Sequence, residues 1–400
     1  MIDLSLSAGE RNVQQMLHWF ARNELRPAAL ECDRTKEVPE PLLRKLRVLS
    51  AGGGLADGVR DRRGDDASRS GKASNLNRLF VVAAEEMAWG DAAIFLSMPG
   101  PGLGGPPIRT MGTEAQRRRF LGIFSGDALR WGAYALTEPG AGSDVAGIRT
   151  RCVQDGDTWV IDGTKCFITN GARASWVVVF ATVDPQLGRA GHRVFVVERG
   201  TPGMRVGRIE DKMGLRASET AELIFEGCRV PEDNLLGGPE HYRRIEGFKG
   251  AMHAFNTSRP IVAAMAVGIG RAAWERAREL ARANTAWNHP SAAMRRLRQT
   301  LAHHARRLHA ARLLCWKAAW MADVGRPNAK EAAMAKAMAA QVAMQVCADA
   351  VAVAAAVGAA ADPWLDKWFR DIKVFDIFEG TGQIQRIVIA RRIIEGLGAF

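Results

Sequence analysis

The spacing of apolar positions first predicts helices. Between Val13 and Phe20 the apolar residues recur every three or four positions, as they do on one face of a helix. Ser7 followed by Glu10 forms a capping box in front of them, which marks a helix start. Similar spacing, interrupted by Gly- and Pro-rich breaks, predicts an all-helical N-terminal third with further helices at 41–49, 75–88 and 113–124. The polar stretch 52–72 predicts a long exposed loop.

From about residue 131 the pattern changes to short apolar runs. Two of the breaks between these runs are Asp162-Gly163 and Asn170-Gly171, and such pairs favour the positive φ angles of hairpin turns. The pattern therefore predicts an antiparallel β domain, built as a barrel or sandwich, with strands at 159–161, 165–169, 176–182, 194–198 and 222–225.

After the stretch 231–239 the sequence becomes Ala-rich and amphipathic, with segments long enough to pack as a C-terminal four-helix bundle. The predicted fold class is therefore α+β and multidomain. We place an N-terminal helical domain at residues 1–130, a β domain at 131–240 and the helical bundle at 241–400.

Composition and charge exclude several classes of protein. The chain has 400 residues and six scattered cysteines without a CxxC pair, which indicates reduced thiols in a cytoplasmic protein. No signal-peptide pattern opens the chain, and the longest apolar run, 350–361, is too short for a membrane span. The net charge of +12 lies along helices without a nucleic-acid motif, so we expect no nucleic-acid partner. A basic surface suits a polyanionic partner.

Three segments carry the candidate chemistry: Tyr134–Asp144 (YALTEPGAGSD), Lys165–Gly171 (KCFITNG) and Phe375–Arg391 (FDIFEGTGQIQRIVIAR). One short Gly-rich string is weak evidence, whereas three segments in this order and at these separations are specific. Together they resemble the acyl-CoA dehydrogenase family of flavoenzymes, of the medium- or short-chain kind. The resemblance is strongest over residues 134–229 and 364–392. It implies the α, β, α domain order, bound FAD, and α,β-dehydrogenation of an acyl thioester by α-proton abstraction and β-hydride transfer to flavin N5.

The candidate base is Glu379, which matches the catalytic carboxylate of this family. It lies in FEGTG, where Gly380 and Gly382 interrupt a helical pattern and Phe378 precedes it. Apolar neighbours indicate a poorly solvated carboxylate with a raised pKa, although a Glu on a C-terminal helix more often faces solvent. By the resemblance, the backbone N–H of Glu379 and a ribityl hydroxyl of the flavin hold the thioester oxygen. Glu138 and Asp144 are the next carboxylates to consider.

The resemblance also implies which residues bind cofactor and substrate. Each expected cofactor contact, taken alone, could be an ordinary strand residue. The prediction of a flavin site therefore rests on the whole set. The expected cofactor contacts are Tyr134, Leu136, Thr137, Ser143, Phe167, Thr169, Thr381 and Gln383. The expected substrate contacts are Ser143, Arg259, Met98 and Gly380. We expect no metal, since the histidines show no HExxH or triad grouping. The GxGxxG string at 100–105 is followed by two prolines and is not a dinucleotide fingerprint.

Four positions depart from the family pattern. Ala283 and Ala286 lie where the family carries an Arg followed by Phe-Gly, and Ala352 stands where it begins a Gln-x-x-Gly-Gly-x-Gly element. The Arg of the first element reaches the FAD pyrophosphate of a neighbouring subunit in relatives, so these departures predict weakened FAD binding and leave FMN or an empty site as alternatives. Asn256 replaces an acidic residue near the CoA groove.

The resemblance also implies partners. We expect an acyl-CoA or an acyl-carrier protein as substrate, an electron-transfer flavoprotein as acceptor, and a homodimer or homotetramer. Two alternatives remain at this point: an acyl-carrier-protein-linked dehydrogenase of specialised metabolism, and a degenerate flavin-free homologue acting as a binding or scaffold protein.

Overall fold

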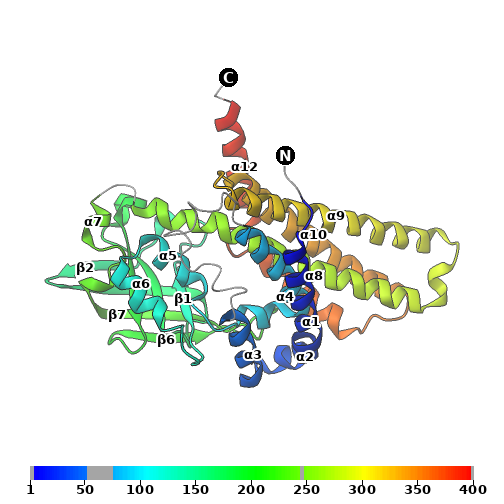
Figure 1. Ribbon diagram of the computed structural model, residues 1–400, viewed down its shortest axis with the longest axis horizontal. Helices are drawn as coiled ribbons and strands as arrows, with labels where there is room; N and C mark the ends of the chain where they lie inside the picture. Colours follow the sequence, from blue (N-terminus) through cyan, green and yellow to red (C-terminus); the bar gives the residue numbers. More distant parts are fainter. Residues whose placement is uncertain (1–3, 52–74, 244–246, 398–400) are drawn as a thin grey trace.

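The computed structural model describes residues 4–51, 75–243 and 247–397 of the chain. A β domain lies at one end and long helices at the other, with the N-terminal helices against both (Figure 1). The loop predicted at 52–72 lies outside the described residues. The N-terminal elements are α1 (Ala8–Phe20), the π-helix η1 (Ala21–Leu25), α2 (Arg26–Thr35), α3 (Glu40–Ala51), α4 (Leu76–Leu96), η3 (Gly102–Gly104), α5 (Gly105–Met111) and α6 (Glu114–Gly122).

The start of α1 is fixed by the predicted capping box. The Glu10 N–H donates to the Ser7 hydroxyl at 3.2 Å, and the Ser7 N–H donates to the Glu10 carboxylate at 2.8 Å. The same carboxylate pairs with Arg78 on α4 at 2.6 Å. One residue therefore both caps α1 and ties it to the next long helix, while Leu17 and Leu25 fill the core below.

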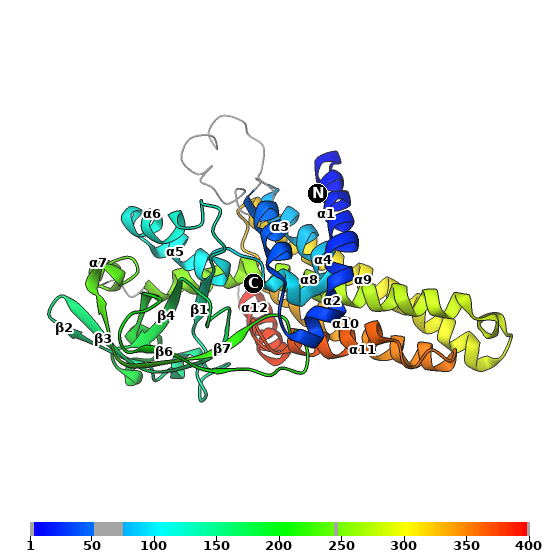
Figure 2. The same cartoon turned by 90° about the horizontal axis from the view of Figure 1, so that it is seen from below.

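The β domain is one continuous seven-stranded sheet in the order β1-β4-β2-β3-β7-β6, with β5 paired to β4. Ala133 and Val177 share a buried cluster with Leu223 and Phe225, so strands from distant parts of the sheet enclose a common core, as the barrel prediction requires. Helices α5 and α6 cover another face (Figure 2). The strands are β1 (Gly132–Ala135), β2 (Arg151–Asp155), β3 (Thr158–Thr169), β4 (Trp176–Thr182), β5 (His192–Glu198), β6 (Met204–Ile209) and β7 (Thr220–Pro231).

The predicted hairpin turns need correction. Asp162-Gly163 does not end a strand: β3 runs through it, and the register against β7 shifts there as in a β-bulge. Gly163 has φ 151°, and a Cβ at this position would lie 2.7 Å from the Thr150 Cα, so the glycine serves close backbone approach. The β2–β3 turn lies instead at Gly156, whose φ is 63°. Asn170 does turn the chain, but β3 pairs with β2 and β7 and not with β4.

The expectation of a purely antiparallel sheet is also corrected. Strand β1 pairs with β4 in parallel, with Ala133 opposite Val177, and Arg151 of β2 meets Thr182 of β4 in parallel. Turn signals report only on strands that are neighbours in sequence, whereas these pairings join distant segments. The parallel pairing sets β1, which carries Tyr134, at an edge of the sheet.

The C-terminal part is the predicted helical bundle. Helix α10 packs against α8, α9 and α12. It is also long and apolar enough to cross a membrane, but 56% of its most apolar stretch is buried inside the fold, as expected of the central helix of a bundle. The elements are α7 (Pro239–Tyr242), α8 (Gly247–Ala283), α9 (Ala292–Asp323), α10 (Ala329–Ala356), α11 (Pro363–Asp371), η8 (Ile372–Asp376) and α12 (Gly382–Leu397).

A buried ion triad joins all three parts of the molecule. Lys367 on α11 lies 2.7 Å from Asp91 on α4 and 2.5 Å from Asp371, and all three side chains are 1% exposed. Asp371 also accepts the Leu215 N–H, from the segment before β7, at 2.6 Å. Burial alone would lower the pKa of Lys367, but the two carboxylates raise it, so the ammonium stays charged. Asp91 has strand-like φ and ψ inside α4, which kinks the helix at this point.

Lys367→Met should be strongly destabilising, because it leaves two buried carboxylates without their cation. The expected loss is about 3–5 kcal/mol of unfolding free energy, measured by urea unfolding monitored by far-UV circular dichroism. Lys317→Met, at an exposed lysine of α9, is the matched control and should change stability by about 0.5 kcal/mol at most. Equal unfolding midpoints for Lys367→Met and wild type would contradict a structural role of the triad.

Candidate functional site

The candidate base lies where η8 ends and before α12 begins. Glu379 has φ 56° and Gly380 has φ 87°, so two consecutive residues adopt left-handed backbone conformations. A left-handed Glu is a strained conformation that the surrounding structure must hold. Gln385 on α12 supplies part of that support, because its Nε2 donates to the carbonyl oxygens of Glu379 at 3.3 Å and of Gly380 at 3.0 Å.

The Glu379 carboxylate faces helix α8. The Ser258 hydroxyl donates to Glu379 Oε2 at 2.9 Å. Burial raises the pKa of Glu379, and the Ser258 hydrogen bond and the positive charges of Arg259 and Lys336 act against that rise. A carboxylate with a raised pKa in a poorly solvated place is suited to accept a proton near neutral pH.

Tyr134 on β1 meets this site from the β domain. Burial raises its pKa well above the usual value, and the negative charge of Glu379 raises it further. This electrostatic interaction indicates that β1 lies near the segment that carries Glu379. Arg259, another predicted residue, is buried in the same place, and its Nη1 donates to Asn256 Oδ1 at 3.1 Å.

Phe167 is the second strained residue of the predicted site. It has φ 59° where β3 shifts register between Lys165 and Ile168. Its ring is nevertheless 63% exposed. A large apolar side chain on a strained backbone, held out into solvent, is costly in the protein alone. The arrangement is suited to stacking against a flat apolar partner.

A buried ion pair holds the Tyr134–Asp144 segment. Lys165 Nζ donates to Glu138 Oε1 at 2.8 Å and to the Leu136 carbonyl at 3.0 Å. Glu138 also accepts the N–H groups of Arg149 and Thr150. Burial would raise the pKa of Glu138, but Lys165 and these hydrogen bonds lower it. Glu138 is therefore a structural carboxylate, and Asp144 is exposed on its loop, so neither alternative base resembles Glu379.

The other predicted residues have less specific surroundings. Within the described part of the chain, no hydrogen bond joins any of them to Glu379. Leu136 is buried; Thr137, Thr169 and Met98 are half-buried; Ser143 and Gln383 are exposed. Thr381 accepts the Ile384 N–H at 3.3 Å and so caps α12.

The two segments that depart from the family pattern touch each other. Asn284 follows α8, and its Nδ2 donates to the carbonyl of Val357, the residue that caps α10, at 2.8 Å. The Asn284 side chain thus binds the C-terminal end of α10 in its own subunit. No guanidinium takes the place of the absent Arg in this contact.

Sequence reasoning missed four polar residues around Glu379. These are Ser258, Lys336, Asp376 and Gln385, of which Lys336 and Gln385 are buried. One signal was available: Lys336 is a lone lysine on the apolar face of an Ala-rich helix. Among the described residues, no three His, Cys, Asp or Glu side chains gather as a metal site.

Known protein families, relatives and solved structures match most of the chain. Residues 246–394 match the family model "acyl-CoA dehydrogenase, C-terminal domain", and residues 133–228 match "acyl-CoA dehydrogenase, middle domain". The chain is 37% identical to the mitochondrial short-chain specific acyl-CoA dehydrogenase of Bos taurus over 96% of this chain and 89% of that one. The structure of butyryl-CoA dehydrogenase from Megasphaera elsdenii aligns with a TM-score of 0.85 and 33% identity, covering 98% of this chain and 100% of the other. The prolyl acyl carrier protein oxidase AnaB aligns with a TM-score of 0.84 and 26% identity over 97% and 100%.

Proposed function

The chain belongs to the acyl-CoA dehydrogenase family, and from that premise we propose that it catalyses flavin-dependent α,β-dehydrogenation of an acyl-CoA with Glu379 as the base. The enzyme is an oxidoreductase acting on a CH–CH group, and its cofactor is FAD. The single observation that carries the assignment of the base is the strained Glu379 carboxylate, with a raised pKa, beside Tyr134 of the β domain.

The residues present fit a flavin. Phe167 offers an exposed ring on a backbone that is strained without a partner, and stacking on a flat heterocycle accounts for both features. Tyr134 on β1, Leu136 and Thr137 directly after it, and Thr169 at the end of β3 supply backbone and hydroxyl groups. We propose that these residues hold the isoalloxazine ring, with Ser143, Thr381 and Gln383 toward the rest of FAD. When bound, FAD supplies the acceptor for the β-hydride.

Glu379 removes the α-proton of the acyl thioester. The Ser258 hydroxyl orients the carboxylate by its hydrogen bond to Oε2, and the poorly solvated setting makes the carboxylate a stronger base than in water. The electron pair left on the α-carbon forms the double bond as the β-hydride departs. The backbone N–H of Glu379 donates to the thioester oxygen, where negative charge develops. Met98, Ser143, Arg259 and Gly380 are the proposed substrate contacts.

The finer identity of the substrate and partners is also a proposal. The basic chain, with its net charge of +12, suits the phosphates of CoA and an acidic electron-transfer flavoprotein. An acyl group on a carrier protein is the second candidate, because Asn256 replaces an acidic residue near the CoA groove and a carrier-protein oxidase shares the fold. The six cysteines are all free and buried, which supports a cytoplasmic enzyme. Comparing kcat/KM for one acyl group on CoA and on a carrier protein separates the two substrates.

The protein should purify yellow and release FAD on denaturation, because the segments proposed to face the isoalloxazine ring are intact. The absorption spectrum of the purified protein and chromatography of the released flavin test this. Released FMN in place of FAD would mean that the divergent segments around Asn284 have changed the cofactor. Colourless protein that takes up neither FAD nor FMN would favour the flavin-free scaffold alternative.

Glu379→Gln should abolish proton abstraction while keeping the flavin. We expect the rate at which an acyl-CoA bleaches the flavin to fall by about 10²- to 10⁴-fold or more, measured by stopped-flow absorbance, with an unchanged resting spectrum. Asp144→Asn, at an exposed carboxylate, is the matched control and should react like wild type. In the wild type the bleaching rate should fall as the pH drops through the raised pKa of Glu379, since only the ionised carboxylate takes the proton. A Glu379→Gln variant that keeps most of the wild-type rate would move the base elsewhere.

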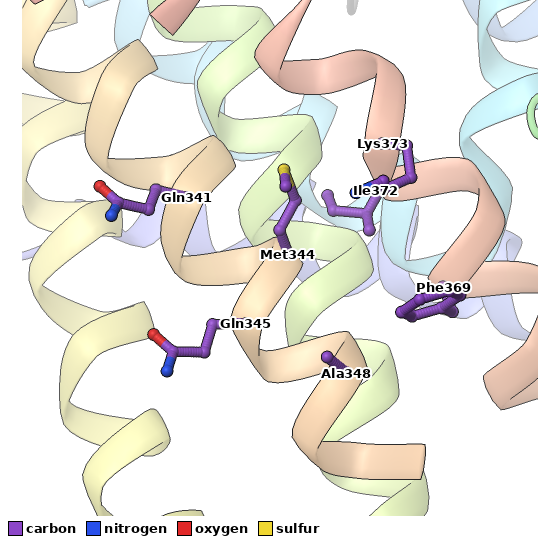
Figure 3. Close-up of a pocket in the computed structure, with 7 residues that line it drawn as sticks. All are labelled: Gln341, Met344, Gln345, Ala348, Phe369, Ile372 and Lys373. Carbon is purple, nitrogen blue, oxygen red and sulfur yellow. The ribbon is translucent and has the colours of Figure 1, made fainter. Parts of the chain in front are cut away.

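The enzyme should also self-associate, through the groove between α10 and the α11–η8 segment (Figure 3). This groove encloses about 310 Å³ and is lined by Gln341, Met344, Gln345, Ala348, Phe369, Ile372 and Lys373. Phe369 is 41% exposed there, and Ile387 and Ile394 of α12 are exposed apolar residues beyond it. We propose that this surface contributes to a homodimer or homotetramer.

Phe369→Glu should shift the assembly toward monomer, because it introduces a charge into an apolar contact. Light scattering after size-exclusion chromatography at micromolar concentration measures the mass. Leu187→Glu, at an exposed apolar residue of the β domain, is the control and should leave the mass unchanged. A strictly monomeric wild type would contradict the proposed assembly.

A further inference from the structure

Lys336 is an unusual residue for the place it occupies. It lies on α10 between Ala335 and Ala337, with 1% of its surface exposed. Within the described residues its Nζ has no hydrogen-bond partner, and no carboxylate oxygen forms an ion pair with it within 4.0 Å. Burying an ammonium group without a partner costs several kcal/mol. A stabilising field from nearby charges must offset that cost.

The charges that face Lys336 come from three other segments. They are Asp376 of η8, Glu379 after it and Arg259 of α8, and the two carboxylates favour the charged form of the lysine. Asp376 Oδ1 is buried and also without a partner in the described part of the chain. Arg386 of α12 approaches it, because a Cβ on Gly382 would touch both Asp376 Oδ1 and Arg386 Nη1. Tyr134 faces Glu379 from the opposite side.

The lysine therefore acts on the base from a distance and not by direct contact. Glu379 takes its one side-chain hydrogen bond among the described residues from Ser258. The positive charges that act on it are those of Arg259 and Lys336. Arg259 already donates a hydrogen bond to Asn256. Within the described residues Lys336 Nζ forms no ion pair, so direct contact with a carboxylate does not neutralise the charge that acts on Asp376 and Glu379.

We propose that Lys336 is a positioning residue for the base: its ammonium group, with Asp376 as countercharge, holds the Glu379 carboxylate ionised before substrate binds. The proposal rests on the proposed function of Glu379. Burial raises the pKa of Glu379, so without a nearby cation a larger fraction of the base would rest protonated. A cation that does not touch the carboxylate keeps it ionised without occupying the oxygen that must take the proton.

The same field makes the site sensitive to pH. Burial lowers the pKa of Lys336 to about 8, and the neighbouring carboxylates act against that shift. Below this value the ammonium is charged and favours the ionised base. Above this pH the lysine loses its charge and no longer stabilises the ionised form of Glu379.

Selective ¹³C labelling of the glutamate carboxyl carbons tests the proposal in the FAD-loaded protein without substrate. Comparison with Glu379→Gln assigns the Glu379 signal, and its chemical shift is followed from acid to alkaline pH. Wild type should show two inflections, the first for Glu379 itself and the second at about pH 8 for Lys336. Lys336→Met should move the first inflection upward by about one pH unit and remove the second. Lys336→Arg should leave the first in place and remove the second, because Arg stays charged.

The pH dependence of flavin bleaching gives a second readout. Its acid limb should move upward in Lys336→Met by the same amount and stay in place in Lys336→Arg. A merely structural lysine would change the rate or the yield of protein without moving the limb. An unmoved first inflection in folded Lys336→Met would overturn the proposal.

Asp376→Asn tests the interaction between Asp376 and Lys336 independently, should Lys336→Met not fold. Removing the countercharge should lower the pKa of Lys336, so the second inflection should move to lower pH. A second inflection that stays at about pH 8 in folded Asp376→Asn would overturn the pairing. Failure of the proposed function is distinguishable: wild type would then fail to react with any acyl-CoA, while the carboxyl titration would still report on Lys336.

Discussion

The ion triad of Lys367 with Asp91 and Asp371 is the constraint on which the site depends. It is the point where the kink of α4, the helix α11 and the segment before β7 are held together by charges that water cannot reach. Breaking one partner of such a cluster costs far more than losing a surface ion pair, because the remaining charges stay buried. Since η8 follows Asp371 directly and Glu379 lies three residues after η8, the triad anchors the start of the segment that carries the proposed base.

The site itself stores strain on both sides of the contact between domains. Phe167 on β3 and Glu379 after η8 both adopt left-handed backbone conformations that cost of order 1–3 kcal/mol each. The neighbouring structure holds each of them in place. The bulge against β7 fixes Phe167, and the Gln385 amide binds the carbonyl of Glu379. The fold thus holds the Phe167 ring and the Glu379 carboxylate on backbone conformations that are unfavourable for an isolated segment.

Local patterns in the sequence predicted local features well. The capping box of α1, the helical bundle and the three motifs were all visible, because each depends on residues close in the chain. The hairpins were misplaced, because Asp162-Gly163 serves a bulge and the parallel β1–β4 pairing joins distant strands. The Lys367 triad and the Ser258–Glu379 hydrogen bond stayed hidden for the same reason. Polar contacts between helices produce no periodic pattern in the sequence. A charged residue on the apolar face of a predicted helix is the one sign of such a contact.

The groups around Glu379 and the divergent segments at Asn284 and Val357 lie at different ends of the bundle. The groups around Glu379 come from one end of α10, near Lys336, whereas Asn284 and Val357 close the other end. Substitutions at the far end can therefore change how the dinucleotide tail is held without altering the field at the base. Among the described residues near this end of α10, the charges of Lys336, Asp376 and Glu379 act on one another. Under the proposed function, removal of the α-proton and binding of the cofactor tail therefore depend on different residues, and the first depends on a few buried charged residues.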